Sequence, residues 1–316
     1  MIVVLTGGTG GAKFVQGLQQ VLAPRDLTAV VNTGDDFVCW GLNISPDLDS
    51  ITYALAGRLS RERGWGIEGD TFECLEAMSA LGEPAWFRLG DRDLATHLFR
   101  TASLRAGKSL SEATREMVAR LGVRSCVLPM SDQPVETRVT TPLGELAFEE
   151  YFVREHYSVP VSAVRFCGAE RAAPAPGVLE AIARAEAILL APSNPVTSIG
   201  PILAVPDIRE ALRRTSAPVA AISPIVAGAA VSGPAAALMT TQGMDVSAAG
   251  VAAAFADFLD VLIADQRDAG QAGAVEATGV AAFFAPTLMK SERGQRALAE
   301  AALRAVALLR TAGAAR

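Results

Sequence analysis

The chain has 316 residues, of which 50% are hydrophobic and 20% are charged, and its formal net charge is −6. This composition suits one large α/β domain, and the lack of a basic block argues against a nucleic-acid partner. Four scattered cysteines and two histidines fit no zinc motif, and neither a charged leader nor an apolar run of about 18 residues is present. We therefore expect a cytoplasmic protein without a membrane partner.

The first half of the chain predicts strands that alternate with helices. "MIVVL" (1–5) reads as a buried strand, "FVQGLQQVL" (14–22) has helical periodicity, and "LTAVVN" (27–32) reads as a second buried strand. A further helix is expected from Ser45, which suits the N-cap, with Pro46 at the first helical position. Two more helices are expected over 90–107 and 111–122.

The second half of the chain begins with a change of pattern. Between about 124 and 170, "VETRVTT-PLG-ELAFEEYFV" alternates around a turn and predicts an inserted antiparallel hairpin. After this region, predicted strands and helices alternate again. An alanine-rich helical tail begins at about 268, with a last helix over 292–310. We expect a single α/β domain (1–316) with a doubly wound, mostly parallel, Rossmann-like sheet.

Polar clusters follow four predicted strands, at the point where each strand ends. Ligands of an open parallel sheet bind beyond the carboxyl ends of its strands. The sequence therefore predicts a single cleft at that rim, formed by Gly7–Lys13, Asn32–Asp36, Ser193–Ser198 and Ser223–Pro224.

The glycine-rich segment after the first strand predicts a phosphate cradle, because glycines let main-chain N–H groups approach an anion closely. It is not a Walker A loop, since Lys13 follows alanine and precedes phenylalanine, and it is an imperfect dinucleotide fingerprint. A tight strand-to-helix turn without a ligand is the alternative. In the phosphate interpretation, the contacts come from Gly8, Thr9, Gly10, Gly11 and Lys13.

Four aspartates lie close together in the sequence: Asp35, Asp36, Asp47 and Asp49. In the first turn of a helix, Asp47 and Asp49 would be stabilised by the helix dipole without any ligand. Being two residues apart, they point to nearly opposite sides of a helix, so only one would face the cleft unless the segment begins extended. Carboxylates beside a phosphate require a bridging cation, and Mg²⁺ takes both kinds of oxygen. We expect Mg²⁺ at Asp35, Asp47 and Asp49, with the choice among them open.

Two later stretches add candidates. In "RLGDRDLATH", Asp93 and His97 can meet on one helical face as a metal pair or an ordinary hydrogen-bonded pair, and Arg88 is placed to reach a ligand. In "APSNPVTSIGPIL", prolines stiffen a loop that carries Ser193, Asn194 and Ser198, small donors that suit a phosphate or a ribose. No serine lies in a nucleophile motif, which favours phosphoryl transfer by positioning and charge neutralisation.

Eight motifs in this order resemble the 2-phospho-L-lactate transferase family of deazaflavin coenzyme F-420 biosynthesis, from Met1 to about Asp268. They are "TGGTGGAKF", "VNTGDD", "SPDLDSITYALAG", "RGWGIEGDTF", "LGDRDLATH", "LPMSDQPVET", "APSNPVTSIGPIL" and "SPIVAGAAVSGPAAALM".

The resemblance implies a magnesium-dependent homodimer that moves a phospho-three-carbon acid from its guanosine diphosphate ester to the ribityl hydroxyl of a deazariboflavin (Fo), with release of GMP. It implies contacts to Fo from Asp49, to which we also assign a catalytic role, and from Arg88, where the family usually has lysine. It places the nucleotide diphosphate at Gly8–Gly11 and Ser193–Ser198.

Two other function classes compete with this interpretation. A non-catalytic regulator that binds a nucleotide sugar would share the fold and the phosphate cradle but would not need the acceptor motifs. An NAD-dependent oxidoreductase is disfavoured by the broken fingerprint and by the lack of an acid for the ribose. The sequence leaves the three-carbon group open among phospholactate, phosphoenolpyruvate and 3-phosphoglycerate.

Overall fold

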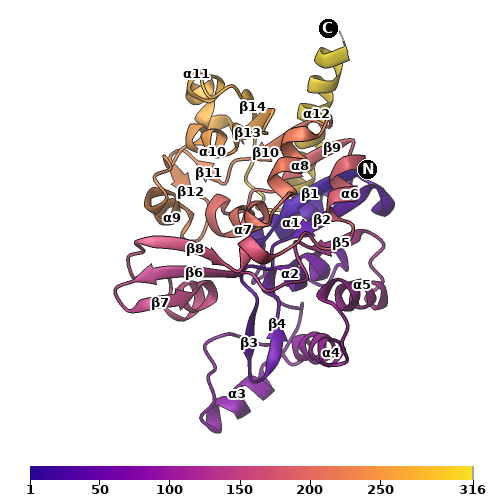
Figure 1. Cartoon of the computed structure of the whole chain (residues 1–316), viewed down its shortest axis with the longest axis vertical. Coiled ribbons are helices and arrows are strands. Elements are labelled where there is room, and N and C mark those ends of the chain that lie inside the picture. Colours follow the sequence, from indigo (N-terminus) through magenta and orange to yellow (C-terminus); the bar gives the residue numbers. More distant parts are fainter. Residues whose placement is uncertain (315–316) are drawn as a thin grey trace.

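The computed structural model describes residues 1–314, with side chains to residue 310, so the last two positions of the predicted domain lie outside the described residues. Within them, seven parallel strands form one sheet in the order β14-β13-β10-β9-β1-β2-β5 (Figure 1). The predicted α/β class with a mostly parallel sheet is confirmed. The strands are β1 (Ile2–Thr6), β2 (Leu27–Val31), β5 (Cys126–Pro129), β9 (Ala187–Leu190), β10 (Val219–Ile222), β13 (Val261–Asp265) and β14 (Ala281–Ala285).

The sheet is wound in both directions from its centre. From β1 the chain continues to β2 and β5 on one side, and it then returns to β9 on the other side before it reaches β10, β13 and β14. The neighbours β1 and β9 therefore form the topological switch point, where ligands bind in open α/β sheets. The predicted clusters Gly7–Lys13 and Ser193–Ser198 follow these two strands.

Helices cover both faces of the sheet, because successive side chains of a strand point to opposite faces. Val3 and Leu5 of β1 join one apolar core, and Ile2 and Val4 join the other. The first core includes α6 (Val178–Arg184), α7 (Gly200–Ala204), α8 (Ile208–Arg214), α9 (Ala235–Thr241), α10 (Ala248–Phe255) and α11 (Ala272–Glu276). The second core includes α1 (Gly8–Gln19), α2 (Pro46–Leu55), α5 (Leu110–Arg120) and α12 (Glu292–Ala314).

The alanine-rich C-terminal part is integrated into the fold. β14 extends the sheet beside β13, and α12 packs along α1 with Leu298 and Ala302 fully buried. The close approach of the two helices requires a glycine at position 17, since a Cβ there would collide with the backbone oxygen of Gln295.

We expect Gly17→Ala to lower the free energy of unfolding by about 2 kcal/mol, because overpacking against backbone outweighs the gain in helix propensity. Gly273→Ala is the matched control, since α11 leaves open space around Gly273 and the same change should be neutral or stabilising. Urea unfolding of both variants measures the difference. Equal stabilities of the two variants would contradict the close contact between α1 and α12.

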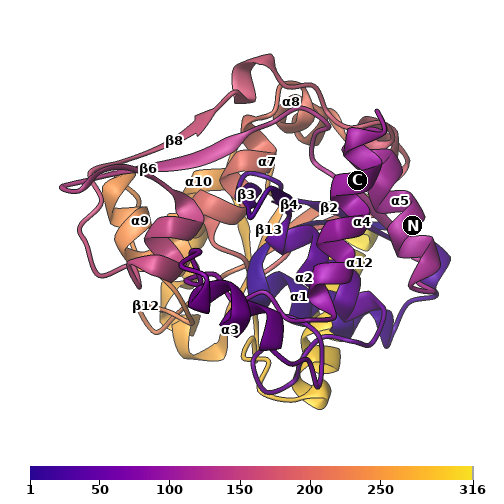
Figure 2. The ribbon, with the colours of Figure 1, turned by 90° about the horizontal axis from the view of Figure 1, so that it is seen from below.

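Short antiparallel sheets are inserted between the parallel strands. The hairpin predicted within 124–170 is confirmed as β6 (Glu136–Thr141) and β7 (Gly144–Ala147), and β8 (Ala163–Cys167) pairs with β6. A second hairpin, β3 (Phe37–Cys39) and β4 (Leu42–Ile44), was not predicted, and β11 (Ile225–Val226) pairs with β12 (Ala229–Ala230). In Figure 2, β8 lies on the opposite side of the molecule from α3 (Glu73–Ala80).

No helix among residues 1–314 has the length and apolar character needed to cross a bilayer.

Candidate active site at the switch point

The glycine-rich segment forms the first turn of α1, so the helix begins six residues before the predicted start at Phe14. Gly8 has a positive φ of 67°. A Cβ on Gly10 would lie 2.6 Å from the carbonyl oxygen of Pro192, and one on Gly11 would collide with the Thr6 hydroxyl. The glycines therefore let the loops after β1 and β9 pack against each other.

Ser193 joins these two loops. Its hydroxyl donates to the Gly7 carbonyl at 2.6 Å and accepts a bond from the Gly7 N–H at 3.4 Å. The Asn194 side chain instead holds its own loop, because its oxygen accepts from the N–H groups of Val196 and Thr197. Ser198 is buried next to the start of α1, within 3.6 Å of a Cβ built at Gly8.

Asn32, at the end of β2, brings two of the predicted aspartates together. Its amide donates to Asp35 and to Asp47, in each case at 2.9 Å. The second oxygen of Asp47 accepts the Gly8 N–H at 2.6 Å, so this carboxylate lies at the N-terminus of α1. The first N–H groups of a helix lack intrahelical partners, which leaves those of Thr9, Gly10 and Gly11 for another anion.

The carboxyl groups at this site lie in surroundings that disfavour their charge. Burial raises the pKa of Asp47 to about 6, although the bonds from Gly8 and Asn32 counteract this. Burial is the main cause that raises the pKa of Asp35 well above its ordinary value, and the negative charge of Asp47 is the second. The same two causes raise the pKa of Glu149 to about 8. Clustered carboxyl groups with raised pKa values are typical of sites that bind a cation.

Glu149 was missed by the sequence analysis. It lies directly after β7, and the inserted antiparallel sheet places it against the acids that follow β2. In the sequence, Glu149 and Glu150 resemble an ordinary exposed pair of acids, so no local pattern indicated that Glu149 is buried. Together with Asp35 and Asp36 it lines a cleft of about 600 Å³ between the insertion and the loop after β2.

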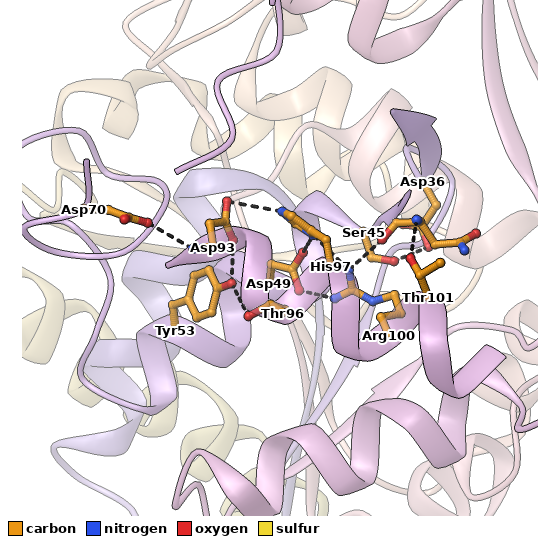
Figure 3. Close-up of polar contacts among 11 residues, drawn as sticks. Asp36, Ser45, Asp49, Tyr53, Asp70, Asp93, Thr96, His97, Arg100 and Thr101 are labelled. Carbon is orange, nitrogen blue, oxygen red and sulfur yellow. Dashed lines mark hydrogen bonds and ion pairs between the residues drawn. The ribbon is translucent and has the colours of Figure 1, made fainter. Parts of the chain in front are cut away.

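Asp49 points away from the glycine turn and toward α4 (Asp93–Arg105), as the two-residue offset from Asp47 predicts. It forms an ion pair with Arg100 and lies 3.5 Å from Nδ1 of His97 (Figure 3). On the other side of the ring, Nε2 lies 3.4 Å from Asp93, which confirms that Asp93 and His97 meet on one helical face. Burial raises the pKa of Asp49, and the charge of Arg100 is the strongest opposing influence.

The polar contacts around Asp49 extend across the interface between α2 and α4 (Figure 3). The Tyr53 hydroxyl contacts Asp93 at 2.5 Å and Thr96 at 2.7 Å. At the other end, Arg100 donates to the Asn43 carbonyl at 3.2 Å and lines the cleft. Arg100 was also missed, because a charged helix residue reads as solvent-facing until its partner helix is known.

The group Asp49, Asp93 and His97 could hold a metal ion, since ligand atoms from the three side chains lie within 4.8 Å of one another. However, a histidine nitrogen suits transition metals better than Mg²⁺, and Arg100 already supplies a positive charge there. The acids after β2 offer oxygen ligands alone, and one oxygen each of Asp35 and Asp36 is buried without a hydrogen bond, as are one oxygen of Asp49 and Nε2 of His97 in the other group. Asp35 and Asp36 thus form a second group of carboxylates, which contains no histidine.

Three further residues from the sequence analysis are Ser45, Arg88 and Lys13. Ser45 is the N-cap residue of α2 as predicted, but its hydroxyl donates to Asp36 at 2.7 Å and does not cap the helix. Arg88 is exposed and lies over the Phe72 ring, with its guanidinium 4.3 Å from the ring centroid. Lys13 lies beside the loop that contains Gly64. The described contacts do not join Arg88 to Asp49.

The family described as 2-phospho-L-lactate transferase CofD matches residues 2–280. A 2-phospho-L-lactate transferase of Methanosarcina acetivorans is 44% identical over 299 residues, which cover 95% of this chain and 97% of that protein. A phosphoenolpyruvate transferase of Streptomyces griseus is 46% identical, with 96% and 97% covered. The solved structure of protein BH3568 from Bacillus halodurans has a TM-score of 0.65 at 18% identity, covers 96% of this chain and 98% of its own, and shows the fold alone. This chain belongs to the 2-phospho-L-lactate transferase family.

Proposed function

We propose that this transferase moves a phospho-three-carbon acid from its guanosine diphosphate ester to the terminal ribityl hydroxyl of Fo. The hydroxyl oxygen attacks the distal phosphorus, the P–O bond to GMP breaks, and the hydroxyl proton leaves the acceptor. Family membership supports the reaction class. The observation that best supports the location of the site is the hydrogen bond from the Gly8 N–H to the Asp47 carboxylate. This bond joins the acid cluster to the start of α1 at the switch point.

For the nucleotide diphosphate we propose the first turn of α1 and the loop after β9. The first N–H groups of a helix lack intrahelical acceptors and are available to an anion, and the helix dipole favours negative charge there. Ser193 and Ser198 border this turn, and Lys13 follows it in α1 with its amine beside Gly64. Asn194 acts by holding the loop. The proposed binding set is Gly8, Thr9, Gly10, Gly11, Lys13, Ser193, Asn194 and Ser198, in which Asn194 supports the loop and Gly8 donates its N–H to Asp47.

For Mg²⁺ we propose Asp35 and Asp47 as ligands, with Asp49 as the less suitable member of the original set. The first two share the Asn32 amide, whereas Asp49 is paired with Arg100. When bound, the ion neutralises negative charge on the transferred phosphate. Asn32 keeps both carboxylates oriented, and the N–H groups of α1 stabilise charge on the departing GMP.

Asp49 remains our candidate for orienting the acceptor, together with Arg88. The pairing with Arg100, which lines the cleft, supports an effect of Asp49 on the acceptor side. If this role is correct, Asp49→Asn weakens the binding of Fo and leaves guanine-nucleotide binding intact. Loss of nucleotide binding with normal Fo binding would contradict the assignment.

The donor is tested by incubating the protein with Mg²⁺, Fo and each activated donor in turn: the phospholactate, phosphoenolpyruvate and 3-phosphoglycerate esters. We expect mass spectrometry to find one Fo product that carries the phospho acid, with equimolar GMP. No mass gain with any donor, together with tight binding of a nucleotide sugar, would favour the non-catalytic regulator. The homodimer implied by the resemblance is a separate proposal, which light scattering tests.

A further inference from the structure

The interface between α2 and α4 contains a chain of buried polar side chains. It runs from Tyr53 through Asp93, His97 and Asp49 to Arg100 (Figure 3). The side chains of His97 and Arg100 are each only 2% exposed. A buried ion pair adds little net stability, because the cost of removing its charges from water offsets their attraction. An arginine retained in this interface therefore indicates a role for its charge beyond stability.

Arg100 is the member of this chain that reaches the cleft. It lines the 600 Å³ cleft together with Asp35, a proposed Mg²⁺ ligand, whereas Asp49 and His97 do not line it. The other cation among the described residues that line the cleft is Arg138, which is partly exposed and paired with an acid. In phosphoryl transfer, an arginine beside the phosphate stabilises the charge of the transition state. Arg100 is the buried cation in a position to do so.

Acceptors on three different elements hold the Arg100 guanidinium. Asp49 of α2 forms the ion pair, and the Asn43 carbonyl of β4 accepts from Nη1 at 3.2 Å. Nη1 also lies 3.4 Å from Nδ1 of His97, one helical turn earlier in α4. Because the donors of a guanidinium form a rigid planar fork, these contacts together fix the plane of the group. Loss of one of them would allow the guanidinium to turn.

The contact with Arg100 also fixes the place of the proton on the His97 ring. An arginine only donates hydrogen bonds, so Nδ1 accepts and carries no proton. The ring proton is then on Nε2, which lies 3.4 Å from a carboxylate oxygen of Asp93. Asp93 is itself held by the Tyr53 hydroxyl at 2.5 Å and by its own N–H, which donates to Asp70 at 3.0 Å. His97 is therefore placed between a fixed carboxylate and Arg100.

We infer that His97 is a positioning residue for Arg100, and that Arg100 presents its positive charge to the phosphate that is transferred. The inference rests on the proposed function, which brings that phosphate to the cleft. His97 does not line the cleft, so it contacts no substrate and takes no proton from the acceptor. Its effect is to hold Arg100 in one orientation before the reaction, so that no reorganisation is needed when charge develops on the phosphate.

Two substitutions of His97 separate positioning from packing. In His97→Asn, the side-chain oxygen can take the place of Nδ1 and accept from Arg100, while the contact with Asp93 is lost. In His97→Gln, the amide nitrogen can take the place of Nε2 and face Asp93, but no atom accepts from Arg100. Both variants remove the same buried ring, so comparable losses of stability are expected.

We expect His97→Gln to lower kcat about a hundredfold and His97→Asn to keep kcat within about fivefold of the wild type. The KM for the donor should change by less than about twofold in either variant, because the orientation of Arg100 matters most in the transition state. Steady-state GMP release measures both constants, and urea unfolding compares the stabilities. His156→Gln is the matched control, since His156 is exposed and does not line the cleft.

A double-mutant cycle tests whether His97 acts through Arg100. Arg100→Lys keeps the charge but loses the planar fork, so this change by itself should lower kcat. Adding His97→Gln to Arg100→Lys should lower kcat by less than about threefold more, whereas the losses of two independent residues would multiply.

Nitrogen NMR of the imidazole rings tests the contact without turnover. The chain has two histidines, so comparison with His97→Asn assigns the buried ring. We expect the Nε2–H tautomer of His97 at pH 7, with a change in its ring signals in Arg100→Lys. A proton on Nδ1 in the wild type would contradict the contact with Arg100.

Equal losses of kcat in His97→Asn and His97→Gln would overturn the positioning role, as would a cycle in which the two losses multiply. A wild-type kcat in His97→Gln would overturn both parts of the inference. Failure of the proposed function is a distinct result, because the wild-type protein would then form no product with any donor. The role of Arg100 toward the phosphate would fail with it, and the NMR measurement would still decide whether His97 holds Arg100.

Discussion

Asp47→Asn is expected to reduce kcat/KM about a thousandfold and to leave the chain folded. The carboxylate accepts the Gly8 N–H and the Asn32 amide, and an asparagine there lacks the negative charge that a cation requires. The fold should persist, because one charge fewer relieves repulsion with Asp35 and Glu149. The loss in kcat/KM for the donor is measured as GMP release under saturating Fo, and thermal unfolding checks the fold.

The control for this variant is Asp245→Asn, at an exposed aspartate that precedes α10. It should keep full activity. A second readout addresses the metal directly: Mg²⁺ together with GDP should raise the Tm of the wild type and of Asp245→Asn, but not that of Asp47→Asn. Retention of more than about a tenth of the wild-type kcat/KM by Asp47→Asn would refute its proposed role, since losing a charged ligand of the metal ion that neutralises the transferred phosphate costs more than that.

Glu149→Gln should stabilise the protein in alkaline, metal-free buffer. The pKa of Glu149 is raised from 4.5 to about 8, so the folded state holds the proton more tightly than the unfolded chain. The stability that this proton contributes is complete below about pH 4.5 and is lost as the pH rises to about 8. A glutamine cannot ionise and avoids this loss.

At pH 8.5 we therefore expect the free energy of unfolding of Glu149→Gln to exceed that of the wild type by about 5 kcal/mol, or roughly 8 °C in Tm, with little difference near pH 4.5. Glu150→Gln is the matched control, because Glu150 pairs with Arg154 at the surface and should not change the pH dependence. Parallel stability curves of wild type and Glu149→Gln between pH 5 and 8.5 would show that Glu149 is not buried among the other acids.

The central strands and the rim of the sheet could be predicted because their signals are local. Apolar runs such as "MIVVL" and "AILLAP" mark buried strands, and the polar residues that follow them share one edge once the strands are parallel. The divergence of Asp47 and Asp49 follows from helical periodicity alone. The β3–β4 hairpin escaped prediction because its strands are three residues long and its turn is Trp-Gly instead of Asn-Gly.

The amino-acid sequence by itself determined the fold class, the family, and which loops meet at the switch point, since these depend on periodicity and on ordered motifs. Only the tertiary structure decided which carboxyl groups share a cleft. Glu149 reaches Asp35 because the inserted antiparallel sheet folds over the rim, and Arg100 reaches Asp49 because α4 packs on α2. Contacts between residues far apart in the chain depend on how whole elements pack, and burial then sets the charge of each group.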